Sequence, residues 1–504
     1  MQNGGNEKLR RVWPVVFVCV VLASVIIRLP GMFGDLWLDE IWTLRDLGKF
    51  DSAVEIFTKE HYDNNHYLNS LILYLLGSRD RWIIYRIHSL VAGAGAVVLA
   101  WLIGRRYGKA EAVFSSLLVG GAYSMIHFSS EARGYALVVF FGFASFIVVR
   151  RFVQSKSWAG AGLFWACVVF GFTSHLTFVH IFVAAGVWLA VELFRTSKNK
   201  VETAVRFAQV FLVPILFVSL FFVMTVSKIN YGGGPDQTLF EVIAEPLSHL
   251  VGGPSEGPIA AGVCMISGGL FVVGILRLRS RGFGEWLFFA VVVVVSPVLV
   301  AAIVRPEYLP GRYFLVSVAF GLVVLGIELA GLWRGGRVCR IIAVVLTMLF
   351  FAGNGWHLAG FYRLGRGSYF EALRFIVEQT AKDEITIVSD HDFRNKMLID
   401  FYEKYLPADK RIVYLSKQDY DEHGADWAIM HKTLAAPGKR YVSFTDKYGT
   451  IYRCIKSVGY SGLSGMNWHI FRLARPASQG PGGQEDKTVE KDGTNSEGGH
   501  IIRN

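Results

Sequence analysis

Eleven apolar runs divide the first 360 residues of the chain, and each is close to the length of about 20 residues that an α-helix needs to cross a bilayer. The uncharged stretch 157–191 is too long for one span, so we expect it to break near Ser174 and His175 into a tight hairpin. The predicted spans lie at about 12–29, 83–104, 111–129, 134–150, 157–174, 176–193, 206–227, 258–276, 284–304, 313–332 and 340–359. This pattern predicts an α-helical polytopic membrane protein rather than a single globular core.

The composition agrees, because 53% of the residues are hydrophobic and only 18% are charged, below the ~25% of an ordinary soluble domain. The net charge of +11 does not indicate nucleic-acid binding, since the basic residues form short tracts between apolar runs. These tracts lie at 8–11, 105–106, 150–151, 277–281 and 334–340. If they face the cytoplasm, the N-terminus is cytoplasmic, and an odd number of spans places the C-terminal region outside the plasma (inner) membrane.

Four regions follow from this topology. We expect a cytoplasmic N-terminus at 1–11, a transmembrane domain at 12–362 with an outer loop at 30–82, a small extracytoplasmic α/β domain at 363–475, and a disordered tail at 476–504. In the α/β domain, Ser368 and Glu371 have the spacing of a capping box that opens a helix. Strand-like runs follow at 385–388, 412–415, 427–430, 452–455 and 468–471.

Two adjacent carboxylates, Asp39 and Glu40, follow the first span between Trp37 and Trp42. A structural explanation is that they lie on the wet face of a helix in the membrane interface. If they take part in a reaction, its substrate must be exposed at the outer leaflet, because the predicted topology places them outside.

The other candidate residues fall on the same outer face. A structural interpretation is available for each of them: a polar turn and helix cap, a buried ion pair, a turn histidine, or a snorkelling arginine. The functional interpretation is that acid, histidine and arginine side chains gather at one membrane surface, where they bind an anionic lipid and a hydroxyl acceptor. These residues are Asp63, His66, Glu131, Arg133, Tyr135, His175, Arg312 and Tyr313.

Five short motifs, in this order and topological placement, resemble the large membrane glycosyltransferases of the GT-C fold. The resemblance is to a family 39-like bacterial branch related to protein O-mannosyltransferases and the lipid A aminoarabinose transferase, and it covers about residues 12–475. The motifs are Leu36-Trp-Leu-Asp39-Glu40, Asn65-His66-Tyr67-Leu68, Glu131-Ala-Arg133-Gly-Tyr135-Ala-Leu137, Ser174-His175 and Arg312-Tyr313. The two prolines that typically follow the histidine of the second motif are missing here.

The resemblance implies that a sugar is transferred from a polyprenyl-phosphate donor to a hydroxyl of a glycan, lipid or protein acceptor, with inversion. Asp39 would be the general base, and Arg133 with Arg312 would stabilise the leaving phosphate. Glu40, His66 and His175 would position the acceptor or hold a divalent metal ion, with Asp63 and His66 as candidate ligands. Glu131, Tyr135 and Tyr313 would complete the substrate-binding site.

Three other functions remain open from the sequence. A ligase that moves a whole lipid-linked oligosaccharide would release a lipid diphosphate. A transporter would carry charged residues near the bilayer midplane, whereas the central parts of these spans carry almost no charge. A non-catalytic scaffold would tolerate Asp39→Asn.

Overall fold

The computed structural model describes residues 3–59, 61–230, 239–254, 257–303, 309–431 and 442–476. The chain forms two compact units, and each is described by itself. Unit 1 comprises residues 1–33 and 43–362, and unit 2 comprises residues 34–42 and 363–504. Most of the predicted tail at 476–504 lies outside the described residues.

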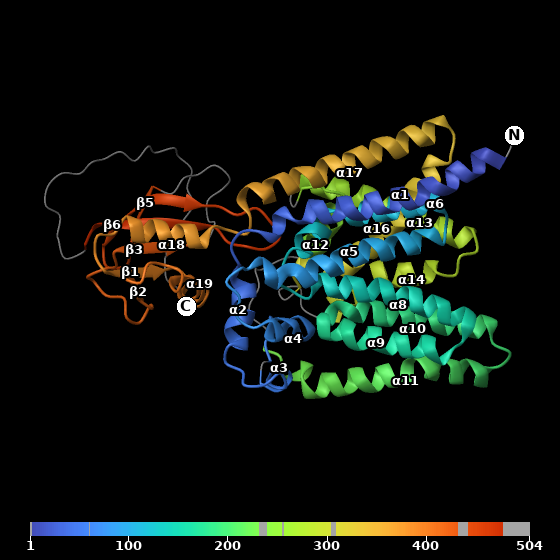
Figure 1. Cartoon of the computed structure of the whole chain (residues 1–504), viewed down its shortest axis with the longest axis horizontal. Coiled ribbons are helices and arrows are strands. Elements are labelled where there is room, and N and C mark those ends of the chain that lie inside the picture. Colours follow the sequence, from blue (N-terminus) through green and yellow to red (C-terminus); the bar gives the residue numbers. More distant parts are fainter. Residues whose placement is uncertain are drawn as a thin grey trace. The chain divides into compact units, whose positions relative to one another are not determined.

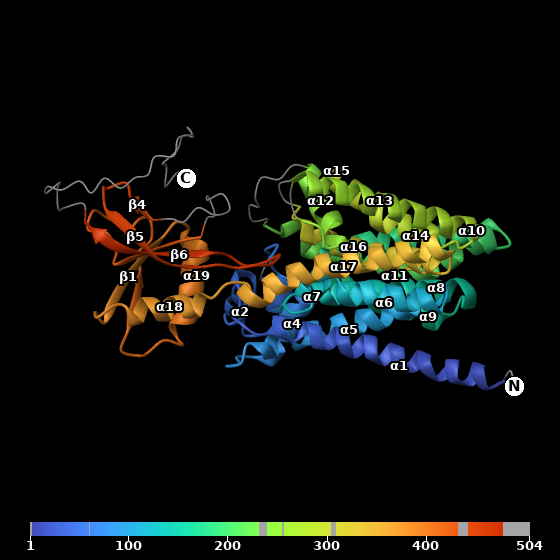
Figure 2. The same cartoon turned by 90° about the horizontal axis from the view of Figure 1, so that it is seen from above.

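Unit 1 is a bundle of long helices (Figures 1 and 2). Its longer helices are α1 (Asn3–Arg28), α4 (Tyr67–Leu76), α5 (Ile83–Arg105), α6 (Lys109–Gly121), α8 (Tyr135–Ser155), α9 (Trp158–Ser174), α10 (Val179–Thr196), α11 (Lys200–Met224), α12 (Leu239–Leu250), α13 (Gly257–Ser280), α16 (Leu315–Trp333) and α17 (Arg337–Leu364). Shorter helical segments are η1 (Pro30–Met32), α3 (Glu55–Thr58), α7 (Tyr123–Phe128), η2 (Leu176–Phe178), η3 (Val226–Lys228), α14 (Trp286–Ala290), the π-helix η4 (Val291–Val295), α15 (Ser296–Ile303) and η6 (Gly311–Phe314).

Nine helical segments of the described chain are long and apolar enough to cross a membrane. The multi-pass architecture is therefore confirmed, although two of the eleven predicted spans form shorter helices. The run predicted at 111–129 is divided at Ala122, whose backbone is extended. The amide nitrogen of Tyr123 then donates to the Asn354 side chain over 2.7 Å, so the break leaves this donor satisfied. Helix α9 has 17 residues and ends at Ser174, and His175 follows with an extended backbone where the hairpin was predicted.

Burial within the bundle matches a membrane environment. Helix α16 is buried from Leu315 to Ala330, so it forms the centre of the bundle. By contrast, α1, α11 and α17 expose apolar side chains such as Val15 (60%), Leu216 (61%) and Met348 (66%). Such apolar surface is stable in contact with lipid tails rather than water.

Unit 2 is a six-stranded sheet with two helices. Its elements are β1 (Glu384–Ser389), β2 (Arg411–Tyr414), β3 (Trp427–Met430), β4 (Ser443–Thr445), β5 (Ile451–Val458), β6 (Trp468–Arg475), α18 (Tyr369–Glu378) and α19 (Asp392–Glu403). The strand order is β2-β1-β3-β6-β5-β4. Strands β2, β1 and β3 are parallel, and the other pairs are antiparallel. All five predicted strands are present, and the small α/β domain is confirmed.

The segment 34–42 packs with unit 2, although it lies more than 300 residues earlier in the sequence. The Tyr402 hydroxyl donates to the carbonyl of Leu36 over 2.7 Å, and Trp42 meets Phe393 edge to face with ring centroids 5.0 Å apart. Helix α2 (Leu38–Leu47) begins in this segment, and its residues from Thr43 onward belong to unit 1.

The predicted capping box is wrong, because the Ser368 side chain makes no capping hydrogen bond. A carboxylate oxygen of Asp35 accepts instead from the amide nitrogen of Phe370 over 2.8 Å. Glu371 pairs with Lys456 on β5, with 2.9 Å between the charged atoms. The cap of α18 thus comes from a residue distant in sequence, which the local motif could not indicate.

Candidate functional site

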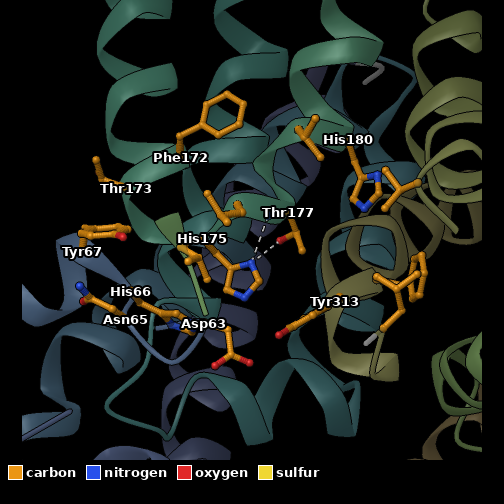
Figure 3. A pocket seen from close by; sticks show the side chains of 16 residues that line it. Asp63, Asn65, His66, Tyr67, Phe172, Thr173, His175, Thr177, His180 and Tyr313 are labelled. Atoms are coloured by element: carbon orange, nitrogen blue, oxygen red, sulfur yellow. Dashed lines mark hydrogen bonds between the residues drawn. The ribbon is translucent and has the colours of Figure 1, made fainter. Parts of the chain in front are cut away.

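A cavity of about 330 Å³ lies in unit 1 between the loop before α4, the turn from α9 to α10, and the start of α16 (Figure 3). Four of the predicted site residues line it: Asp63, His66, His175 and Tyr313. Much of the remaining wall is apolar and includes Phe172, Leu176, Val179, Ile229, Val300, Leu309 and Phe314. The cavity therefore combines a polar group of side chains with surface suited to a hydrocarbon chain.

His66 stands at the N-cap of α4, but its side chain does not cap that helix. Its Nδ1 accepts from the amide nitrogen of Gly134 over 2.8 Å. The ring is 4% exposed and meets the rings of Tyr135 and His175 edge to face, at centroid distances of 5.0 and 4.6 Å. The motif before α4 is thus joined to the one before α8 and to the hairpin turn.

The guanidinium of Arg133 lies next to the imidazole of His66. Its Nη2 is 3.3 Å from His66 Nε2, and its Nη1 donates to the Asn64 carbonyl and to Asn64 Oδ1 over 2.8 and 2.6 Å. Asn64 in turn donates from Nδ2 to the Thr43 hydroxyl over 3.2 Å. Arg133 is 2% exposed, so two acceptors on Asn64 fix the direction of its planar fork. The sequence did not single out Asn64, which lies beside Asp63 in a run of polar residues.

His175 is held by the residue two positions further along the chain. Its Nδ1 lies 2.8 Å from Thr177 Oγ1 and accepts from the Thr177 amide nitrogen over 3.1 Å. Its ring lies 4.9 Å from that of Tyr135 and 5.4 Å from that of Tyr313, measured between centroids. Thr177 also lines the cavity. The sequence predicted a turn at His175 but not this contact, which depends on the extended backbone of His175.

Gly134 allows these elements to meet. A Cβ atom at this position would come within 2.0 Å of the Ser174 carbonyl oxygen and 3.0 Å of His66 Nδ1. The glycine between Arg133 and Tyr135 is therefore required for the close approach of the chain before α8 to the hairpin turn.

Among the three histidines that line the cavity, His66 and His175 favour the neutral form at physiological pH. Burial, and then the positive charges of Arg133 and Arg312, lower the pKa of His175 to about 3. Burial and the charge of Arg133 also hold the pKa of His66 well below its ordinary value of 6.5. Arg312 is half-buried, and its positive charge thus contributes to the lowered pKa of both histidines.

Asp63 is the one carboxylate among the described residues that line the cavity (Figure 3). Glu131 is in a different environment. It is fully buried, and its Oε1 lies 3.1 Å from Nε2 of His127, whose ring packs 4.7 Å from that of Phe361. The cavity lining, as far as the chain is described, does not include Glu131.

Asp39 and Glu40 belong to unit 2, in the first turn of α2. A carboxylate oxygen of Glu40 accepts from the amide nitrogen of Trp37 over 3.2 Å, which is the return bond of a capping box. Glu40 is fully buried, and Asp39 is 9% exposed. A structural role in starting α2 thus accounts for Glu40.

The predicted metal ligands do not fit a divalent cation. Throughout the ranges described, no three His, Cys, Asp or Glu side chains gather as a metal site. His66 Nδ1 already accepts an amide proton, and its Nε2 faces the positive charge of Arg133. The groups around His66 therefore suit an anion better than a cation.

The arrangement of helices and sheet is the GT-C fold, which the chain shares with a solved structure of ArnT. No family model matches the sequence, and no curated protein is similar to it. Among solved structures, ArnT from Cupriavidus metallidurans in the apo state has a TM-score of 0.51 and 12% sequence identity, with 92% of this chain and 98% of that chain covered.

Two further solved structures are more weakly similar. ArnT from the same organism bound to undecaprenyl phosphate has a TM-score of 0.47 and 14% identity, covering 91% of this chain and 97% of that one. The oligosaccharyltransferase of Archaeoglobus fulgidus in the apo form has a TM-score of 0.49 and 10% identity, covering 83% and 69%. At these identities the comparisons concern the fold alone.

Proposed function

We propose that this protein is a membrane glycosyltransferase that moves a sugar from a polyprenyl-phosphate donor to an acceptor hydroxyl at the outer face of the membrane. The observation that carries the proposal is the convergence of His66, Arg133 and His175 beside an apolar-walled cavity. Hydrogen-bond donors and a guanidinium suit a phosphate, and the apolar wall suits the first isoprene units. The fold it shares with ArnT supports the same class of reaction.

In the proposed reaction, the acceptor oxygen forms a bond to the anomeric carbon while the bond from that carbon to the phosphate oxygen breaks. The electron pair of the broken bond leaves with the phosphate, which gains one negative charge. Arg133, with Arg312 nearby, stabilises that charge. A carboxylate takes the proton of the acceptor hydroxyl.

Two carboxylates are candidates for the general base. Asp39 is favoured by the resemblance of its motif to the GT-C family. Asp63 is favoured by its position in the cavity wall. A glycan, lipid or protein could supply the hydroxyl, and unit 2 is a candidate surface for binding it.

The proposal is tested with purified protein in lipid vesicles and radiolabelled polyprenyl-phosphate sugars, with acceptors of the three classes. We expect sugar release or transfer by wild type and a loss of about 100-fold or more in one of Asp39→Asn and Asp63→Asn. Asp51→Asn, an exposed position in the same outer loop, is the matched control. Bound donor with no turnover under any acceptor would favour a transporter or scaffold and overturn the proposal.

A further inference from the structure

His180 is a third histidine in the cavity wall, and it comes from a segment that is long and apolar enough to span the membrane. It is the second residue of α10, is 1% exposed, and lines the cavity together with His175 and Tyr313 (Figure 3). Its ring stacks on that of Phe314, with centroids 6.1 Å apart. A polar side chain within a span is costly and marks a place where it has a partner or a function, so each ring nitrogen of His180 should have a partner.

One of these nitrogens is held by a serine on another span. His180 Nδ1 lies 2.9 Å from Ser296 Oγ, and both residues are buried. Ser296 directly follows the π-helix η4, in which the carbonyl of Val292 accepts from the Ser317 hydroxyl of α16 over 2.7 Å. A π-helical turn adds a residue, so it rotates the residues that follow by about 100° relative to a continuous α-helix. The contact of Ser296 with His180 thus depends on this turn.

Three polar atoms of the cavity-lining residues have no hydrogen-bond partner in the part of the chain that the structure describes. They are Nε2 of His175, Nε2 of His180 and the hydroxyl of Tyr313. In both histidines Nδ1 has a hydroxyl partner, so Nε2 is the ring nitrogen left for a ligand. An imidazole nitrogen donates or accepts according to its tautomer, and a phenol hydroxyl does both.

This set of atoms suits the hydroxyl groups of a sugar. A hydroxyl donates and accepts, so it pairs with either tautomer of an imidazole and with a phenol. A phosphate oxygen accepts only and is negatively charged, and the carboxylate of Asp63 lies in the same wall. An isoprene chain would leave all three polar atoms unpaired, which is unfavourable for buried groups. The volume of about 330 Å³ lies near the lower end of the range for small-molecule sites.

We propose that His180 is a specificity-determining residue that, with His175 and Tyr313, binds the hydroxyl groups of the transferred sugar, and that Ser296 is a positioning residue that holds the His180 ring. The inference rests on the proposed function and adds the part of the cavity that receives the sugar of the donor. A sugar of a glycan acceptor has the same hydroxyl chemistry, and the experiment distinguishes the two sources.

The experiment compares lipids with and without a sugar, using full-length protein in nanodiscs. The probes are polyprenyl phosphate and polyprenyl phosphates that carry glucose, mannose or N-acetylglucosamine. We expect wild type to bind at least one sugar-bearing lipid more tightly than polyprenyl phosphate. His180→Phe and Tyr313→Phe should each weaken binding of that lipid by roughly tenfold, the effect of losing a hydrogen bond, and leave binding of polyprenyl phosphate unchanged. His180→Gln, which places an amide nitrogen near the Nε2 position, should retain most of the binding.

Two further substitutions test the position of the His180 ring. Ser296→Thr keeps the hydroxyl and should bind the sugar-bearing lipid as wild type does, whereas Ser296→Ala should bind it several-fold more weakly. Thr173→Val is the matched control, because Thr173 lines the same cavity but its hydroxyl already donates to the carbonyl of Val169 over 2.7 Å. We expect this control to bind both kinds of lipid as wild type does.

The two kinds of lipid separate sugar binding from a purely structural role. Equal weakening of both lipids in His180→Phe and in Ser296→Ala would overturn the inference, and so would a wild type whose binding no sugar strengthens. If the variants weaken binding of a free oligosaccharide acceptor but not of the donor lipid, the cavity binds the acceptor and the assignment to the donor is wrong.

Failure of the proposed function gives a different result. A wild type that binds neither polyprenyl phosphate nor its sugar-bearing forms would reject both proposals. A wild type that transfers sugar, with an unchanged KM for the donor in His180→Phe and Tyr313→Phe, would reject the inference alone.

Discussion

Gly134 links three of the sequence motifs at the scale of single residues. A Cβ atom in Gly134→Ala would overlap the Ser174 carbonyl oxygen, so the chain before α8 or the hairpin turn must shift. We expect the free energy of unfolding to fall by about 1–3 kcal/mol and lipid-phosphate binding to weaken, as measured by thermal unfolding and binding in nanodiscs. The matched control is Gly162→Ala in α9, where an added Cβ meets no atom within 4 Å. Equal stability of both variants would contradict the close approach.

His175 makes stability depend on pH. An unfolded histidine has a pKa near 6.5, whereas burial lowers the pKa of His175 to about 3 in the folded protein. Between these values the unfolded chain binds more protons, so the free energy of unfolding falls as pH drops below about 6.5. The contribution of His175 amounts to about 2 kcal/mol between pH 7 and pH 5.

Thermal scans across this pH range should therefore show a midpoint that falls with acidification, and a smaller fall in His175→Gln. If both proteins have the same slope, His175 is not the buried neutral group described here.

Cavity residues that belong to a sequence motif could be predicted. The residues that hydrogen-bond to them could not. Asp63, His66, His175 and Tyr313 were all named from the sequence and all line the cavity. Asn64 and Thr177 were missed because their roles depend on how the chain turns beside Arg133 and His175. The contact between the buried His127 and Glu131 side chains was also not indicated by the sequence.

At the scale of elements, helix α18 is capped by Asp35, a residue far away in the sequence, and this contact can be tested by substitution. Asp35→Ala should cost about 1 kcal/mol of local stability, because the Phe370 amide loses its acceptor. Asp35→Asn should retain most of the cap, and Ser368→Ala should have little effect because its side chain makes no capping bond. Amide hydrogen exchange of residues 366–380 in the full-length protein measures all three. Faster exchange in Ser368→Ala than in Asp35→Ala would contradict the assignment.

Helices and strands were predictable because hydrophobic periodicity and run length report burial directly. The break at Ala122 was not, because it depends on the Asn354 side chain, which accepts from the Tyr123 amide 231 residues earlier in the chain. The cap from Asp35 was missed for the same reason. Sequence patterns report local preference, and these two features are long-range contacts.

At the scale of the whole molecule, the distribution of basic tracts predicts a membrane orientation. We expect Ser280→Cys, at the end of α13, to face the cytoplasm and Asp421→Cys, in unit 2, to face outward; both positions are exposed. The five native cysteines, Cys19, Cys167, Cys264, Cys339 and Cys454, are first replaced. A membrane-impermeant maleimide added to intact cells should then label Asp421→Cys alone. Labelling of Ser280→Cys alone would contradict the predicted orientation and indicate the opposite one.

The measurement that tests the central claim most directly is the identity of the lipid released during turnover. Purified protein in vesicles is given a polyprenyl-phosphate sugar and an accepted hydroxyl substrate, and the lipid product is analysed by mass spectrometry. The proposed reaction predicts polyprenyl monophosphate in one-to-one ratio with transferred sugar, and its loss in the Arg133→Ala variant. A polyprenyl diphosphate product from a diphosphate-linked donor, with the monophosphate-linked donor left intact, would contradict the account and identify an oligosaccharide ligase.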